Sequence, residues 1–156
     1  MSHRIRTGAC GTVQRNRFSL LLVEDNPGDV DLAREALGES EFAIDLRVAR
    51  DGEEAMAFLR RKGRHKKAPR PGLILLDLNL PKKDGREVLA ELKVDESLKR
   101  IPVVILTTSR CEEDVRNSYD LHANCYITKP LDLSQFMKSV KSIAAFWLNT
   151  AVLPPN

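Results

Sequence analysis

Residues 73–81 read LILLDLNLP, in which four large apolar residues lead directly into the aspartate Asp77. A short run that is apolar at every position is typical of a strand buried on both faces of a parallel sheet. Burying an unpaired carboxylate is costly, so Asp77 needs either a partner or a chemical role at the end of such a strand. We therefore interpret the stretch as a central strand with a paired or functional carboxylate at its carboxyl end.

Further short runs rich in branched residues occur at 20–23, 44–48, 103–106 and 126–128. Longer stretches with helical spacing separate the runs, and one of them, residues 136–147, follows the last run. Five strands that alternate with five helices predict a parallel sheet with helices on both faces. Because crossovers are right-handed, the economical topology is a three-layer α/β/α sandwich around a doubly wound sheet.

Several helix starts are legible in the sequence. The candidate N-caps are Asn26, Asp51, Asp84 and Ser109. Asn26 precedes a proline, which suits the first helical position, while Asp84 and Ser109 each have a glutamate at the spacing of a capping box. In the last helix we expect the aromatic residues, Phe146 among them, to belong to the core.

The composition is that of one ordinary globular domain. The chain has 156 residues, of which 42% are hydrophobic and 30% charged. No apolar run is long enough for a membrane span, and no signal-type apolar segment follows the basic N-terminus. The three cysteines, Cys10, Cys111 and Cys125, include no CxxC pair, which favours free thiols in a reducing compartment. We therefore expect a cytoplasmic protein without a membrane partner.

Basic residues are concentrated in two segments. Residues 1–17 contain four arginines, residues 60–70 contain seven lysines or arginines, and neither segment contains an acid. The other 14 basic and 22 acidic residues give the rest of the chain a net charge of −8. We expect 1–17 to be a disordered tail and 60–70 to be a helix end plus a solvated loop. Nucleic-acid-binding proteins normally spread basic charge over a folded face, so nucleic acid is not an expected partner.

The predicted strands end in residues that can carry chemistry. Glu24 and Asp25 follow the first strand, Asp77 the third, Thr107 the fourth and Lys129 the fifth. Because the carboxyl ends of parallel strands meet at one edge of the sheet, we expect these groups to converge. Clustered carboxylates repel one another unless a cation joins them. An oxygen-only set without His or Cys favours a hard cation, and Mg²⁺ above others.

Such an arrangement suits a phosphoryl group. A metal on one side of Asp77 and Lys129 on the other would neutralise the phosphoryl oxygens, with help from the Thr107 hydroxyl. A carboxylate can also act as the nucleophile that forms an aspartyl phosphate. The hypothesis is therefore that Asp77 is a phosphoacceptor, and the alternative is a structural carboxylate bonded to backbone amides.

The sequence resembles a response-regulator receiver domain, the phosphoacceptor half of two-component signalling. The motifs that carry the resemblance are VEDN (23–26), LLDLNLPKKDG (75–85), VVILTTS (103–109) and YITKP (126–130). Their spacing agrees, because Thr107 lies thirty residues after Asp77 and Lys129 twenty-two residues after Thr107. The segments NPGDVDLAREAL, APRPGLILLDLNLPKKDGREVLAELK and DLHANCYITKP resemble the stand-alone regulators that work with bacterial phytochrome-type histidine kinases.

The resemblance implies a flavodoxin-like, CheY-like fold whose five-stranded parallel sheet has the order 2-1-3-4-5. It implies that Asp77 takes a phosphoryl group from a phosphohistidine of a histidine kinase, a bacteriophytochrome in the narrower resemblance. The implied ligands of Mg²⁺ are Glu24, Asp25, Asp77 and Asn79, the last through its main-chain carbonyl. Lys129 would pair with the phosphoryl group, Thr107 would move to hydrogen-bond it, and Tyr126 would swing inward.

The resemblance also implies a domain organisation. Residues 18–148 would form the receiver domain, and residues 149–156 a short tail without an output domain. The protein would gain and lose its own phosphoryl group rather than act as a turnover enzyme. It would signal through a changed surface, built from the fourth helix, fifth strand and fifth helix, that an unidentified downstream protein binds. The apolar end AAFWLNTAVL (144–153) leads us to expect a homodimer through the C-terminal half.

Two positions depart from the commonest receiver pattern: Glu24 replaces a frequent aspartate, and Thr108 is larger than the usual residue there. Three other functions stay open. A phosphatase of the haloacid-dehalogenase type would need a second aspartate where the chain has Asn79. A flavin-binding domain would need a Ser/Thr/Gly-rich loop where the chain has EDNPGD (24–29). A pseudo-receiver would bind partners without phosphorylation, although the intact Asp77 and Lys129 argue against it.

Overall fold

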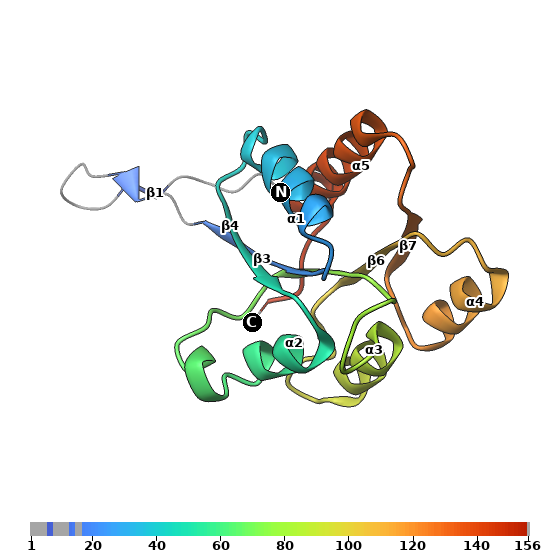
Figure 1. Cartoon of the computed structure of the whole chain (residues 1–156). Coiled ribbons are helices and arrows are strands. Elements are labelled where there is room, and N and C mark those ends of the chain that lie inside the picture. The colour runs from blue at the N-terminus through green and yellow to red at the C-terminus, as the bar shows by residue number, and fades with distance from the viewer. Residues whose placement is uncertain (1–5, 8–12, 15–16, 156) are drawn as a thin grey trace.

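The structure is a computed structural model that describes residues 6–7, 13–14 and 17–155, and its centre is a five-stranded sheet (Figure 1). The strands of this sheet are β3 (Phe18–Val23), β4 (Ile44–Ala49), β5 (Leu73–Leu76), β6 (Val103–Thr107) and β7 (Cys125–Thr128). They are all parallel, in the order β4-β3-β5-β6-β7. Counted from β3, this is the order 2-1-3-4-5, which confirms the predicted topology.

Helices cover both faces of the sheet. The bounds are α1 (Pro27–Gly38), α2 (Gly52–Leu59), α3 (Gly85–Val94), α4 (Glu112–Asp120) and α5 (Leu133–Ala145). Figure 1 shows α1 and α5 side by side on one face and α2 and α3 on the other, while α4 lies beside β7. A 3₁₀ turn, η1 (Gly63–His65), follows α2, and a π-helical turn, η2 (Phe146–Thr150), follows α5. The three-layer sandwich is therefore confirmed.

The solidly apolar strands fill two separate cores. In β5, Ile74 and Leu76 face the core under α2 and α3, whereas Leu73 and Leu75 face the core under α1 and α5. All four side chains are fully buried. Successive side chains of a strand point to opposite faces, so a strand covered on both sides has no position for a polar residue until it ends. In this way the core places Asp77 at the edge of the sheet.

Three of the four predicted N-caps are confirmed. The side chains of Asn26, Asp51 and Asp84 accept hydrogen bonds from backbone N–H groups in the first turns of α1, α2 and α3. The prediction for Ser109 is wrong, because the residue before α4 is Cys111 and it makes no side-chain cap. The Ser109 hydroxyl instead donates to Asp114, five residues further along the chain, at 2.6 Å.

The chain segments outside the sandwich agree with the sequence in part. Helix α2 ends at Leu59, and the basic segment 60–70 is a largely exposed loop around η1, as predicted. Phe146 was expected in the core, but 51% of it is exposed because it lies at the turn where α5 ends. Of the predicted tail, β1 (Arg6–Thr7) and β2 (Val13–Gln14) pair antiparallel, and its other residues before Arg17 lie outside the described ones. In the described part of the chain, each helix is too short or too polar to cross a membrane.

Candidate functional site

The sheet register brings the predicted site residues to one edge. Asp77 extends β5 by one residue, since its N–H donates to the carbonyl of Val23 at 3.1 Å. Lys129 extends β7 in the same manner, with its N–H 2.7 Å from the carbonyl of Thr107. Glu24 and Asp25 directly follow β3, the neighbour of β5. The carboxyl ends of the four adjacent strands β3, β5, β6 and β7 therefore carry the side chains that the sequence predicted to converge.

Three carboxylates form a cluster at this edge. Glu24, Asp25 and Asp77 each offer one oxygen, and these oxygens lie within 4.8 Å of one another. Asp25 is exposed, whereas Glu24 and Asp77 are only 2% and 7% exposed. Oxygen-only donors with one solvent-facing member fit a hard cation that keeps part of its water shell.

A buried ammonium group contacts two of the three carboxylates of the cluster. Lys129 is 5% exposed, and its Nζ donates to Glu24 Oε2 at 2.5 Å, to Asp29 Oδ2 at 2.9 Å and to Asp77 Oδ2 at 3.1 Å. Burial opposes the charged form of Lys129, but the hydrogen bonds that it donates to Glu24 and Asp29 outweigh burial and hold its pKa above the ordinary value. Lys129 is therefore a fixed positive charge beside Asp77.

The cluster carries more negative charge than Lys129 can balance. Burial is the main reason that the pKa of Glu24 is raised from 4.5 to about 7, and the neighbouring charge of Asp77 adds to it. The hydrogen bond from Lys129 opposes this rise without cancelling it. The carboxylates of Glu24, Asp29 and Asp77 all share the one ammonium of Lys129, and Asp25 lies in the same cluster. A second cation at this edge would relieve the imbalance.

A tight turn supports Asp77 from behind. The N–H of Asn79 donates to Asp77 Oδ1 at 3.2 Å, and the N–H of Gly85 donates to the carbonyl of Leu78 at 2.9 Å. A Cβ atom on Gly85 would lie 2.1 Å from the carbonyl oxygen of Asp77, so only glycine permits this approach. The turn fixes the backbone of Asp77 between β5 and α3.

Thr107 and Tyr126 lie near the loop between β6 and α4 rather than on the acceptor. Thr107 is fully buried, and its Oγ1 accepts a long hydrogen bond of 3.5 Å from the N–H of Ser109. The Tyr126 hydroxyl donates to the carbonyl of Ser109 at 2.9 Å. Among the hydrogen bonds of the described residues, none joins Thr107 or Tyr126 to Asp77. Both side chains are instead connected through Ser109.

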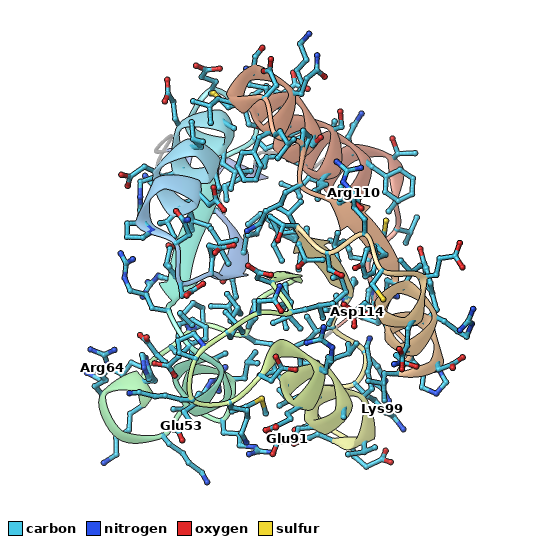
Figure 2. All side chains as sticks on the ribbon, turned by 45° about the vertical axis from the view of Figure 1, so that its right-hand side comes forward. Glu53, Arg64, Glu91, Lys99, Arg110 and Asp114 are labelled. Atoms are coloured by element: carbon cyan, nitrogen blue, oxygen red, sulfur yellow. The ribbon has the colours of Figure 1, made fainter. Side chains whose placement is uncertain are left out.

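Sequence reasoning missed two groups of residues at this site. Asp29 binds Lys129, and the available signal was its place in the first turn of a helix whose start Asn26 and Pro27 fix. The second group is Arg86 with Asp114, whose Nη2–Oδ1 distance is 2.7 Å. In Figure 2, Asp114 lies on the side of α4 that faces α3. These two residues are 28 positions apart, so nothing in the local sequence pattern links them.

Comparison with known proteins gives the class of this protein. The family model of the response regulator receiver domain matches residues 20–141. The chain belongs to this family, which is the family that its motifs resemble, and it is a signalling protein of the response-regulator type.

Individual relatives agree with the family. The response regulator Rcp1 of Synechocystis sp. is 56% identical over 135 residues, which are 86% of this chain and 92% of Rcp1. The solved structure of the phosphorylated cyanobacterial phytochrome response regulator RcpA is 58% identical, with a TM-score of 0.87 over 90% of this chain and 100% of that one. The Mn²⁺-bound form of Rcp1 is 55% identical, with a TM-score of 0.85 over 88% of this chain and 99% of that one. This chain is thus similar to phytochrome response regulators.

Proposed function

We propose that Asp77 accepts a phosphoryl group from a phosphohistidine of a histidine kinase. The observation that carries the proposal is that the Asp77 carboxylate lies 3.1 Å from the Lys129 ammonium and in one cluster with the carboxylates of Glu24 and Asp25. In the transfer, an oxygen of Asp77 attacks phosphorus, the new O–P bond forms, and the N–P bond to the imidazole breaks. The intact set of groups favours this function over that of a pseudo-receiver.

The same residues fit Mg²⁺. The carboxylates of Glu24, Asp25 and Asp77 and the main-chain carbonyl of Asn79 would hold the ion, which supplies positive charge to the oxygens of the phosphoryl group. Glu24 is longer than the aspartate common at its position, and its oxygen nonetheless lies within the cluster. The solved Mn²⁺-bound form of the relative Rcp1 supports the binding of a divalent cation.

The other side chains of the site take separate roles. Lys129 pairs with an oxygen of the transferred group, because its Nζ already contacts Asp77 and its raised pKa keeps it charged. Among the described residues, the Thr107 hydroxyl has one hydrogen bond, the long one from the Ser109 N–H, so it can turn toward a phosphoryl oxygen at small cost. Tyr126 then follows the loop, since its hydroxyl is bonded to Ser109. Phosphorylation of Asp77 thereby changes the protein surface around α4 and β7.

The partner that loads the site is a histidine kinase, and the similarity to the phytochrome response regulator RcpA favours one of the phytochrome type. A downstream protein reads the changed surface. A homodimer through the C-terminal half is supported by the exposure of Phe146 and Val152, which are 51% and 80% exposed. The mass of the wild type in solution, with and without a phosphoryl mimic, tests the dimer. A monomer under both conditions rules it out.

Intact mass spectrometry tests the phosphoryl transfer. The wild type is incubated with acetyl phosphate and Mg²⁺ beside Asp77→Asn, which keeps the size of the side chain and removes the nucleophile. We expect one phosphoryl adduct on the wild type, none on the variant, and none after Mg²⁺ is chelated. A wild type that takes no adduct from several donors is a pseudo-receiver, whose partners bind the unphosphorylated form.

A further inference from the structure

We propose that Arg86 and Asp114 form a latch that positions the loop of residues 107–111 and restrains its movement on phosphorylation. The latch residues are positioning residues, since neither contacts the acceptor carboxylate. The inference rests on the proposed phosphorylation of Asp77, and it adds a control element outside the phosphoryl site.

The centre of the latch is the Asp114 carboxylate, on which three donors converge. The Ser109 hydroxyl donates at 2.6 Å, Arg86 Nε at 3.1 Å and Arg86 Nη2 at 2.7 Å. The Asp114 side chain is 19% exposed, and that of Arg86 34%. These bonds join the start of α3, the start of α4 and the loop between β6 and α4 through one carboxylate.

The α3 end of the latch is fixed to the acceptor turn. Arg86 Nη1 also donates to Asp84 Oδ2 at 3.1 Å, and Asp84 caps the start of α3 by accepting from the N–H of Arg86. Gly85, which lies between Asp84 and Arg86, packs so closely on the carbonyl of Asp77 that a Cβ atom would not fit there. The guanidinium of Arg86 is therefore oriented by the same turn that holds Asp77.

The loop end of the latch meets both of the proposed moving side chains. Ser109 donates its N–H to Thr107 and accepts the Tyr126 hydroxyl bond at its carbonyl. A Thr107 hydroxyl that turns toward a phosphoryl group on Asp77 releases the Ser109 N–H, and a Tyr126 that moves releases the Ser109 carbonyl. The 2.6 Å bond to Asp114 still holds Ser109 to α4, and it limits how far the loop can follow. The latch thus opposes the movement that the phosphoryl group favours.

A single exposed ion pair contributes little to stability, so the restraint from Arg86 and Asp114 depends on the geometry of their contacts. Three converging donors, two of them from one guanidinium fork, restrict Asp114 far more than one flexible contact does. The bond from Ser109 and then that from Arg86 lower the pKa of Asp114, in agreement with a well-satisfied carboxylate. A matched control exists beside it: Glu91 of α3 accepts two hydrogen bonds from Lys83 Nζ in the preceding turn, at 2.7 and 2.8 Å, and among the described residues neither partner is hydrogen-bonded to residues 107–111.

The test compares Arg86→Gln, Asp114→Asn, their double variant and the control Glu91→Gln with the wild type. The initial rate of adduct formation from acetyl phosphate at saturating Mg²⁺ is read by intact mass. Releasing the latch should raise this rate by about five- to tenfold, and the double variant should be no faster than either single one. Glu91→Gln should match the wild type, and thermal unfolding shows whether each variant is folded.

A second measurement keeps the two proposals separate. Backbone hydrogen exchange of the loop 107–111 in the unphosphorylated protein should be faster in Arg86→Gln and Asp114→Asn than in Glu91→Gln. If the wild type takes no phosphoryl group, the proposed function fails, and exchange alone decides whether the latch holds the loop. Unchanged exchange, an unchanged or reduced adduct rate, or additive effects in the double variant would overturn the latch.

Discussion

The ammonium of Lys129 lies 2.5 Å from Glu24 Oε2 and 3.1 Å from Asp77 Oδ2, so one buried cation joins the proposed acceptor to a proposed metal ligand. This relationship answers the question that Asp77 raises at the end of a buried strand. The carboxylate has a partner, yet the partner is shared with Glu24 and Asp29 and leaves negative charge in excess. The excess of carboxylates favours the binding of a further cation, and the Lys129 ammonium can bind the oxygens of an anionic group.

Replacing Lys129 by methionine should destabilise the protein strongly. The variant leaves the buried carboxylates of Glu24 and Asp77 without their cation, and removing one partner of a buried pair costs about 3–5 kcal/mol. Urea unfolding in a chelating buffer measures the loss in free energy of unfolding. Added Mg²⁺ should restore part of it, because a ligand that binds the folded state stabilises that state. Lys129→Arg is the control that keeps the charge, and an equal loss in both variants would count against the charge argument.

The ionisation of Glu24 should make stability depend on pH. In the folded protein the pKa of Glu24 is about 7 instead of 4.5, so the folded state keeps this proton over a range in which the unfolded state has lost it. Without a metal, the free energy of unfolding of the wild type relative to Glu24→Gln should therefore fall as pH rises from about 4.5 to 7.

The size of this fall is about 3 kcal/mol, because each pKa unit corresponds to about 1.4 kcal/mol. Urea titrations of the two proteins at a series of pH values in a chelating buffer measure the difference. Taking the difference removes the contributions of the other carboxylates. A difference that is constant with pH, or that grows with it, would show that Glu24 is ionised at low pH in the folded protein.

Two glycines should be intolerant of a methyl group, and a third serves as their control. A Cβ on Gly85 would lie 2.1 Å from the Asp77 carbonyl oxygen, and a Cβ on Gly52 would lie 2.0 Å from that of Lys83. Alanine at either position forces backbone to move and should cost about 1–3 kcal/mol. Gly38 has no atom within 4 Å of such a Cβ, so Gly38→Ala should be neutral or stabilising by up to about 1 kcal/mol. Thermal and urea unfolding of the three variants would refute this ranking if Gly38→Ala were the most harmful.

The sequence was a good guide wherever a feature is local or repeated along the chain. The apolar runs predicted all strands of the central sheet, because a strand buried on both faces shows its burial at each position. Because parallel strands end at one edge of the sheet, the sequence alone predicts that Glu24, Asp77 and Lys129 lie together. The caps at Asn26, Asp51 and Asp84 were legible because the capping group and its partner are neighbours in sequence.

The rest depends on contacts between distant segments. Ser109 has the spacing of a helix cap, but the carboxylate of Asp114 attracts its hydroxyl, and Arg86 holds that carboxylate from another helix. Asp29 reaches Lys129, which lies 100 residues away. Phe146 has the spacing of a core residue, yet the helix changes to a π-helical turn there and leaves the ring half exposed. Pattern along one segment contains no information about such partners.

The most direct test of the account locates the phosphoryl group chemically. The wild type is treated with acetyl phosphate and Mg²⁺, the acyl phosphate is reduced with borohydride, and the digested protein is mapped by mass spectrometry. An acyl phosphate on aspartate is reduced to homoserine, whereas an unmodified carboxylate is left as it is. We predict homoserine at position 77 alone, and none when Mg²⁺ is omitted. Modification at another carboxylate, or none anywhere in a protein that is shown to be folded, would contradict the assignment of Asp77 as the phosphoacceptor.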